Sequence, residues 1–311
     1  MPNFDSPPRF ERYREIVPCW QDFLRALERP LPTCIWANPL KITSGQLEAL
    51  LAEQRIDFEP LPWRSGAYRL LNTPHPGSRI AFLAGLYQIQ EEASMLPVEF
   101  MDLKPGQRIL DACAAPGSKT TQIATRHPRG TTVVANDRNY RRMRPLARSV
   151  DRLGITNTVI TVHDASNLPG QIGTFDRVLA DVPCSGEGTS RKNRDISAAD
   201  ETDFSNLCGV QRAILKRCLE LCRPGGRVVY STCTWAPEEN EAIVDDVLRE
   251  FSPRWKLIPA RLPRFPASPG LVHWRGQRFD DQLENALRVY PHQHDTGGFF
   301  VAVLQHTCCP S

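Results

Sequence analysis

Short apolar runs alternate with longer amphipathic stretches from Arg108 onward. The runs are about 4 to 8 residues long, rich in β-branched residues and followed by Gly, Pro, Asp or Asn, which is typical of buried strands. With the residues that follow them, they lie at 108–114, 131–137, 158–166, 175–183 and 226–234. The stretches between them predict helices at 119–126, 139–153, 205–222 and 238–251. This alternation predicts an α/β fold with a doubly wound, mostly parallel sheet covered by helices on both faces.

Before about residue 100 the pattern differs. Residues 11–30 are helical in pattern, residues 31–42 extended, and residues 43–54 helical again, with Thr43 or Ser44 as the N-cap. We therefore predict two domains: a small α+β domain at residues 1–100 and the large α/β domain at residues 101–311. A late strand, Phe299 to His306, is expected to close the edge of the large sheet.

Composition fits a folded chain without a membrane span or secretion signal. The chain has 311 residues, of which 41% are hydrophobic, and lacks the run of about 18 apolar residues that a bilayer span needs. We expect a cytoplasmic protein whose ten cysteines are reduced, and the mild net charge of +3 favours a monomer. Cys218 and Cys222 lack a second pair of ligands, so we interpret them as core residues and predict no metal site.

The predicted strands end in acids. Asp111, Asp137, Asp164 and Asp181 follow four successive runs, and ligands of an open parallel sheet bind at the carboxyl ends of its strands. Any single Asp could instead cap the next helix. Four carboxylates suit a ligand with a ribose, an amino group and a positive centre, as in S-adenosylmethionine, better than the pyrophosphate of NAD.

The loop after the first strand is suited to the same ligand. Ala114, Ala115 and Gly117 carry little side-chain bulk, and the helix that begins near Ser118 offers free N–H groups to a carboxylate. This loop lacks the three-glycine pattern of dinucleotide-binding proteins.

Two cysteines follow neighbouring strands of the predicted sheet. Cys184 lies in "DVPCSGEG" and Cys233 in "YSTCTW", so both thiols should face one cleft beside the ligand pocket. A free cysteine is more often a small buried hydrophobe. Beside a methyl donor, however, a thiolate has a use: its addition to C6 of a cytosine makes C5 nucleophilic enough to accept a methyl group.

Four segments together resemble one known family. The sequences "DACAAPGSKT", "DVPCSGEGTSRKN", "RPGGRVVYSTCTWAPEENEAIV" and "PHQHDTGGFFVAVL" are similar to the ordered motifs of the RNA 5-methylcytosine methyltransferases of the Nop2/Sun (NSUN, Fmu) family. The resemblance covers about residues 30 to 305. It implies a Rossmann-like class I methyltransferase domain, S-adenosylmethionine as cofactor and tRNA or rRNA as substrate.

The resemblance also implies residue roles. Cys233 is the expected nucleophile at C6, Cys184 the thiol that helps to free the methylated product, and Asp181 the acid that contacts the cytosine ring and the cofactor. The implied cofactor contacts are Cys113, Ala114, Ala115, Pro116, Gly117, Ser118, Lys119, Asp137, Asp164 and Asp181. Ser118 departs from the usual glycine of this loop, and Lys119 could equally be a surface residue.

RNA contacts are expected in three places. The resemblance implies phosphate contacts at Arg191 and Lys192, and an RNA-binding domain of RNA-recognition-motif type near the N-terminus. Residues 138–152 contain six arginines, a candidate phosphate-binding face that is equally consistent with a solvated helix. In the small domain we expect stacking and charge to grip RNA at Trp36, Lys41, Trp63, Arg64, Tyr68 and Arg69.

Two other functions remain open at this point. A DNA cytosine-5 methyltransferase would use the Pro-Cys thiol as nucleophile and leave the Thr-Cys thiol without a role. A non-catalytic RNA-binding or ribosome-assembly protein could keep the same fold.

Overall fold

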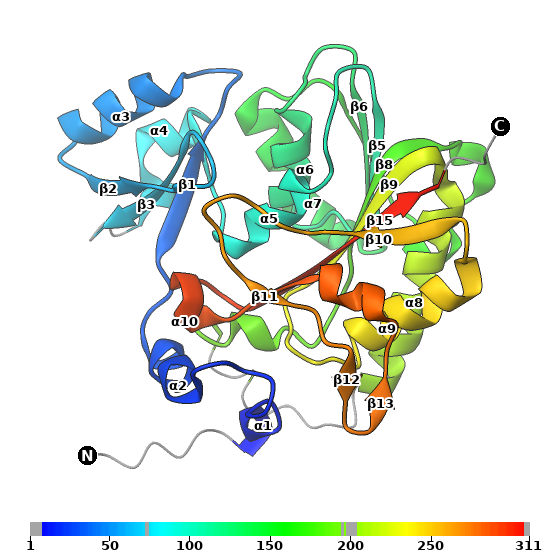
Figure 1. The fold of residues 1–311 in the computed structure, drawn as a ribbon. Coiled ribbons are helices and arrows are strands. Elements are labelled where there is room, and N and C mark those ends of the chain that lie inside the picture. The colour runs from blue at the N-terminus through cyan, green and yellow to red at the C-terminus, as the bar shows by residue number, and fades with distance from the viewer. Residues whose placement is uncertain (1–7, 72–74, 194–195, 197–203, 308–311) are drawn as a thin grey trace.

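The computed structural model describes residues 8–71, 75–193, 196 and 204–307. Figure 1 shows a small domain, from β1 to β4, beside a large sheet flanked by helices. The helices are α1 (Pro8–Glu11), α2 (Trp20–Glu28), α3 (Ser44–Glu53), α4 (Ile80–Leu83), α5 (Leu96–Glu99), α6 (Ser118–Ala124), α7 (Tyr140–Leu153), α8 (Phe204–Leu221), α9 (Glu241–Phe251) and α10 (Pro291–His294). The strands are β1 (Thr33–Ala37), β2 (Asp57–Pro60), β3 (Ala67–Leu71), β4 (Tyr87–Ile89), β5 (Arg108–Asp111), β6 (Thr132–Asn136), β7 (Thr158–Thr161), β8 (Phe175–Asp181), β9 (Cys222–Thr232), β10 (Trp255–Ile258), β11 (Ser268–Pro269), β12 (His273–Trp274), β13 (Gln277–Arg278), β14 (Leu287–Val289) and β15 (Phe299–His306).

The large sheet has the predicted doubly wound form. Its order is β11-β14-β15-β9-β8-β5-β6-β7, with β10 also pairing with β15. The five strands from β9 to β7 are parallel. The strand order reverses between β5 and β8, so their carboxyl ends form the crevice in which such sheets bind ligands.

The prediction that residues 299–306 close the edge of the sheet is wrong. The strand exists as β15, but it lies inside the sheet, antiparallel to β9 on one side and to β14 and β10 on the other. Its first six residues are buried, because sheet neighbours cover both edges and helices cover both faces.

Alternating side chains divide the core between the two faces of the sheet. Leu110 and Tyr230 point toward α8 and α9, where they pack with Leu215 and Val247. Ile109 and Val229 lie in the cluster on the other face, which contains residues from α6 and α7. This alternation is the period of two expected for strands, and it holds the strand ends on both sides of the crevice in fixed register.

The small domain is an antiparallel sheet of order β2-β3-β1-β4 with the chain order β-α-β-β-α-β. Thr43, one of the two predicted N-caps, caps α3, and Gln46 completes a capping box. One face of the sheet packs on α3 and α4 through Ile35 and Tyr68. The other face, which carries Trp36, packs on residues 93–100 and the large domain.

Segments α1 and α2 pack with the large domain, although they precede the small sheet. Phe10, Tyr13 and Phe23 lie in the cluster that contains Trp235 and Tyr290. The ring centroids of Phe10 and Phe23 lie 5.5 and 5.1 Å from that of Trp235. The N-terminal helices therefore brace the loop that follows β9.

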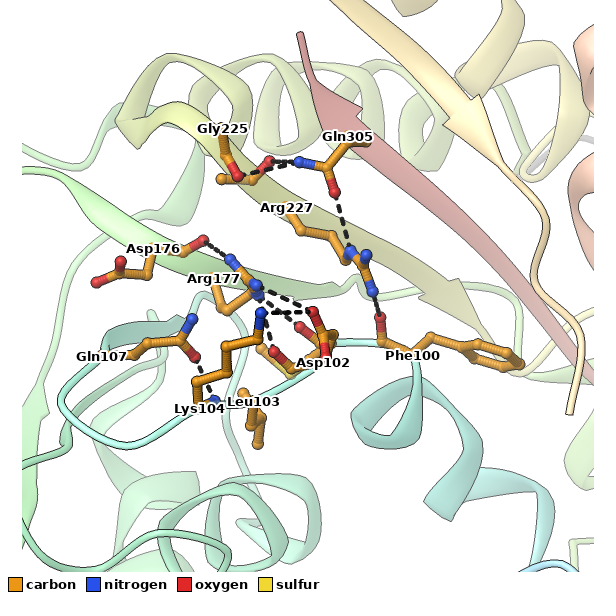
Figure 2. Close-up of polar contacts among 12 residues, drawn as sticks. Phe100, Asp102, Leu103, Lys104, Gln107, Asp176, Arg177, Gly225, Arg227 and Gln305 are labelled. Atoms are coloured by element: carbon orange, nitrogen blue, oxygen red, sulfur yellow. Dashed lines mark hydrogen bonds and ion pairs between the residues drawn. The ribbon is translucent and has the colours of Figure 1, made fainter. Parts of the chain in front are cut away.

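Arg177 on β8 and Arg227 on β9 lie at the end of the sheet opposite the crevice, where they bind backbone carbonyls (Figure 2). Arg177 donates from Nε to the Met101 carbonyl at 2.6 Å, and Arg227 donates from Nη1 to the Phe100 carbonyl at 2.8 Å. Arg227 also donates to the side chain of Gln305 on β15. These bonds satisfy carbonyls at the end of α5, which helices leave unpaired, and they tie the segment between the two domains to β8 and β9.

Candidate active site

A cavity of about 380 Å³ opens at the carboxyl ends of the parallel strands. Six of the predicted cofactor residues line it: Cys113, Ala115, Pro116, Asp137, Asp164 and Asp181. Its volume lies in the range of small-molecule sites. Ala114 and Gly117 line neither this cavity nor the second one described below; Gly117 has a φ of 110° and lets α6 approach α7, since a Cβ there would lie 2.9 Å from Leu146.

The carboxylates of this cavity have different surroundings. Asp137 is 4% exposed, and its Oδ2 accepts a hydrogen bond from the Ala115 N–H at 3.2 Å. Asp164 is exposed, and hydrogen bonds from the side chain and N–H of Ser166 hold its pKa below the usual range. The carboxylate oxygens of Asp137 and Asp164 suit hydroxyl and amino donors, while burial leaves little water to compete at Asp137.

Asp111 is separate from the cavity lining. It is fully buried, accepts a hydrogen bond from Thr120 Oγ1 at 2.6 Å, and its Oδ1 has no partner. Burial raises the pKa of Asp111 to about 7. Asp111 therefore supports the start of α6 through Thr120.

A second cavity, of about 310 Å³, adjoins the first. Both are lined by Pro116, Asp181, Val182 and Cys233, so these residues form the boundary between them. The remaining lining residues of the second cavity are Leu31, Glu91, Ser94, Ser118, Lys119, Gly188, Thr189, Lys192, Gly297, Gly298 and Phe299. Glu91 was not predicted from the sequence, and Gly188 and the Gly-Gly-Phe segment were predicted only as parts of longer motifs, without a place in a cavity.

Lys119 and Asp181 form an ion pair at this boundary. Lys119 Nζ donates to Asp181 Oδ2 at 2.7 Å, and Ser231 Oγ donates to Asp181 Oδ1 at 2.7 Å. Burial opposes the charge of Lys119, but the Asp181 carboxylate outweighs this effect, so the pKa of Lys119 is raised. Lys119, predicted as a cofactor contact, thus lies on the side of the second cavity.

Cys184 lines the first cavity and lies beside Cys233, which lines both. Cys184 Sγ is 3.4 Å from Cys233 Sγ, and both residues are partly exposed. The hydrogen bond to Cys233, with burial and the nearby Glu239, raises the pKa of Cys184 well above its usual value. Cys184 therefore favours the protonated form, in which its S–H can donate to the sulfur of Cys233.

Two glycine backbones bring the loops of the second cavity together. Gly188 N–H donates to the Cys233 carbonyl at 2.9 Å, and Gly298 N–H donates to the Gly188 carbonyl at 2.8 Å. A Cβ on Gly188 would lie 2.3 Å from the Gly298 carbonyl oxygen, and one on Gly298 would lie 2.2 Å from Trp235 Nε1. Glycine is needed at both positions, because Gly188 touches the backbone of Gly298 and Gly298 touches the indole ring of Trp235.

The expected phosphate contact at Arg191 is wrong. Its side chain is fully buried, and its guanidinium donates to Asp295 and to the carbonyls of Thr296 and Pro30. The residue joins the segment after α2 to the loop before β15. Lys192, next in the chain, is exposed and lines the second cavity.

The expected RNA grip in the small domain is also wrong for Trp36, Tyr68 and Arg64, which are buried, whereas Lys41 is exposed. Trp36 and Tyr68 are each 1% exposed, and Arg64 is buried beside Glu99. Lys41 Nζ donates to the carbonyls of Ala84 and Arg152. In RNA-recognition motifs aromatic residues of the sheet stack on bases, but here the corresponding face is buried against residues 93–100.

The six arginines of residues 138–152 divide into two sets. Arg142 donates to the Ala115 carbonyl at 2.8 Å, and Arg152 donates to the carbonyls of Phe82 and Tyr87, so both have structural partners. The others are exposed, and within the described part of the chain they form no ion pair. This second set consists of Arg138, which precedes α7 and lines the first cavity, and the α7 arginine face, which is Arg141, Arg144 and Arg148.

Family models match most of the chain. The model of 16S rRNA methyltransferase RsmB/F matches residues 98–305, and the model of the N-terminal domain of 16S rRNA methyltransferase RsmF matches residues 7–92. A solved methyltransferase homolog protein from Pyrococcus horikoshii is 32% identical with a TM-score of 0.85, over 95% of this chain and 93% of that one. In the described ranges no helix is long and apolar enough to cross a membrane.

Individual relatives differ in length. The tRNA (cytosine(49)-C(5))-methyltransferase of Pyrococcus abyssi is 35% identical over 95% of this chain and 94% of its own length. The ribosomal RNA small subunit methyltransferase F of Escherichia coli is 36% identical over 94% of this chain and 62% of its own. The chain spans about a third of the 28S rRNA (cytosine-C(5))-methyltransferases of Mus musculus and Homo sapiens, at 35% identity. With two thirds of its length matched by the first model, the chain belongs to the 16S rRNA methyltransferase RsmB/F family.

Proposed function

We propose that this protein transfers a methyl group from S-adenosylmethionine to carbon 5 of a cytosine in RNA through a covalent bond between Cys233 and C6. The observation that carries this proposal is the position of the thiol pair. Cys233 lines both cavities, with Cys184 3.4 Å away and Asp181 on the same boundary. One cavity can therefore hold the methyl donor and the other the base, with the nucleophile between them.

Cys233 starts the reaction. Its thiolate forms a bond to C6, the C5–C6 double bond opens, and the electron density moves to C5. We assign Asp181 to the base: its carboxylate can accept a hydrogen bond from the exocyclic amino group of the cytosine, and from N3 once that nitrogen is protonated. Lys119 and Ser231 hold the two oxygens of that carboxylate in place. The ion pair fixes the orientation of Asp181, because two short hydrogen bonds restrict its rotation.

The residues of the first cavity fit the methyl donor. Asp137, Asp164 and the backbone around Ala115 present acceptors to ribose hydroxyls and an amino group, and no phosphate-binding glycine loop is present at residues 113–119. When bound, the donor supplies an electrophilic methyl group to C5. Asp181 and Cys233 lie where the two ligands would meet.

Release of the product involves the second thiol. The C5 proton leaves to water, the C5–C6 double bond forms again, and the C6–S electron pair returns to Cys233. Since its raised pKa keeps Cys184 protonated, its S–H can hydrogen-bond the departing sulfur. Without Cys184 the departing thiolate loses this donor, and the adduct should persist.

The target cytosine must leave its helix to reach the second cavity, because a stacked base cannot present C6 to a thiol. Lys192 and the α7 arginine face are the exposed cations that we assign to RNA phosphates. The relatives named for tRNA and for rRNA both support RNA as the substrate.

The test measures 5-methylcytidine by mass spectrometry after incubation of the protein with S-adenosylmethionine and RNA transcripts. The proposal predicts product with the wild type and none with Cys233→Ala. Product that depends on Cys184 and not on Cys233 would favour the DNA-type assignment of the thiols. No product with any RNA, and no binding of S-adenosylmethionine in calorimetry, would favour a non-catalytic protein.

A further inference from the structure

The loops that carry the two thiols are each tied to the turn that precedes α9. Glu239 Oε2 accepts a hydrogen bond from the Ser185 N–H at 2.9 Å and another from Gln211 Nε2 at 2.7 Å. Gln211 Nε2 also donates to the Pro183 carbonyl at 2.9 Å. The residues on both sides of Cys184 are therefore held by one glutamate and one glutamine.

Asn240 makes the corresponding contacts on the other loop. Its Nδ2 donates to the Thr234 carbonyl at 3.1 Å, and its Oδ1 accepts from Thr232 Oγ1 at 2.6 Å. Thr232 and Thr234 flank Cys233 in the chain. Glu239 thus holds the backbone after Cys184, while Gln211 holds the carbonyl before it. Asn240 bonds to the residues on both sides of Cys233, to the side chain of Thr232 and the backbone of Thr234.

These contacts are shielded from water. Gln211, Glu239 and Asn240 are all 0% exposed. Tyr230 OH donates to the Glu239 carbonyl at 2.6 Å, which fixes the backbone between the two side chains. Buried hydrogen bonds have no solvent to replace them, so the loss of one displaces the loop that it holds.

We propose that Glu239 and Asn240 are separate positioning residues for the two thiols, with Glu239 and Gln211 placing Cys184 for product release and Asn240 placing Cys233 for attack. The inference rests on the proposed function. None of the three residues lines either cavity, so each acts through the loop that it holds.

The proposal predicts different effects on the amount of RNA adduct for the contacts that hold Cys184 and for those that hold Cys233. A displaced Cys184 slows release, so an RNA adduct accumulates on Cys233. A displaced Cys233 slows attack, so the adduct forms slowly and does not accumulate. A general loss of folding would lower both steps together, and it would not raise the amount of adduct.

The experiment compares two nearly isosteric variants, Gln211→Met and Thr232→Val, in the full chain. Thr125→Val serves as the matched control, because Thr125 is buried and hydrogen-bonds within α6 and its C-terminal end, away from the thiols. Adduct with substrate RNA is quantified on denaturing gels over time, and thermal unfolding checks that each variant is folded. Glu239→Gln keeps an acceptor for Ser185 and should retain more release activity than Glu239→Ala.

We expect Gln211→Met to raise the steady level of adduct and to slow release about tenfold, the effect of about one buried hydrogen bond. Thr232→Val should slow adduct formation about tenfold without accumulation. Cys184→Ala is run in parallel. If Cys184→Ala accumulates adduct while Gln211→Met behaves like Thr232→Val or like the control, the assignment of Glu239 and Gln211 to Cys184 is wrong. If Cys184→Ala and the wild type both give neither adduct nor product, the proposed function itself fails.

Discussion

Replacing Lys119 by methionine removes the ammonium group that pairs with Asp181 and keeps most of the side-chain volume. The pair is mostly buried, with the Lys119 side chain 11% and the Asp181 side chain 26% exposed. Lys119 Nζ lies 2.7 Å from Asp181 Oδ2. A hydrogen bond to a charged group contributes about 1.5 to 3 kcal/mol. If Asp181 must be held at the base in the transition state, this free energy corresponds to roughly a 10- to 150-fold loss of rate.

The assay is single-turnover methylation with saturating S-adenosylmethionine, so that binding and release do not limit the rate. Cys233 and Cys184 remain in place, and adduct formation should slow to the same extent as methylation because Asp181 acts on the ring when sulfur adds. Lys256→Met is the control, since Lys256 is exposed on β10. A Lys119→Met variant that methylates within twofold of the wild type would refute a role for the ion pair.

Three further perturbations follow from the geometry. Burial raises the pKa of Asp111 to about 7, so the protonated carboxyl stabilises the fold below its unfolded pKa, and this contribution is lost as the pH rises through about 7. Asp111→Asn should therefore make the denaturation midpoint less dependent on pH between about 4 and 7, and should add up to about 4 kcal/mol to the free energy of unfolding at pH 8. An unchanged pH profile would count against this reasoning. Gly188→Ala should lower the melting temperature and abolish RNA adduct formation, because the new Cβ would lie 2.3 Å from a carbonyl oxygen, whereas Gly45→Ala, with open space, should do neither. Substitution by glutamine at Arg141, Arg144 and Arg148 should reduce the slope of log affinity for RNA against log salt by about 2; an unchanged slope would show that RNA does not touch this face.

The alternation of strands and helices was predictable because periodicity reports directly which faces are buried. The carboxyl ends of β5, β6 and β8 carry acids as expected, and Cys184 and Cys233 lie together because β8 and β9 are neighbours. The cap at Thr43 was also predictable, since it depends on residues three apart in the chain.

Long-range contacts were not predictable from the pattern. Trp36 is of a residue type that commonly stacks on RNA bases. Whether it is buried depends on how the small sheet packs on residues 93–100. Arg191 is buried by carbonyls more than 100 residues away in both directions. β15 has the same apolar run whether it is an edge or an interior strand, so the sequence could not decide its place.

The polar support of the site was hidden for a similar reason. Glu239 and Asn240 lie in a segment whose acids read as an ordinary helix start, and only the three-dimensional structure shows that they reach the two thiol loops. The ion pair of Lys119 could not be predicted either, because its partner Asp181 is 62 residues away in the chain and no local pattern links the two.

The most direct test of the account is the purification of Cys184→Ala from cells, followed by analysis for RNA bound covalently to the protein. The account predicts an adduct at Cys233 that survives denaturation and disappears in the double variant Cys184→Ala, Cys233→Ala; sequencing the attached RNA would identify the substrate and the cytosine. A Cys184→Ala protein free of RNA, together with a Cys233→Ala protein that still forms 5-methylcytidine, would contradict the roles assigned to both thiols.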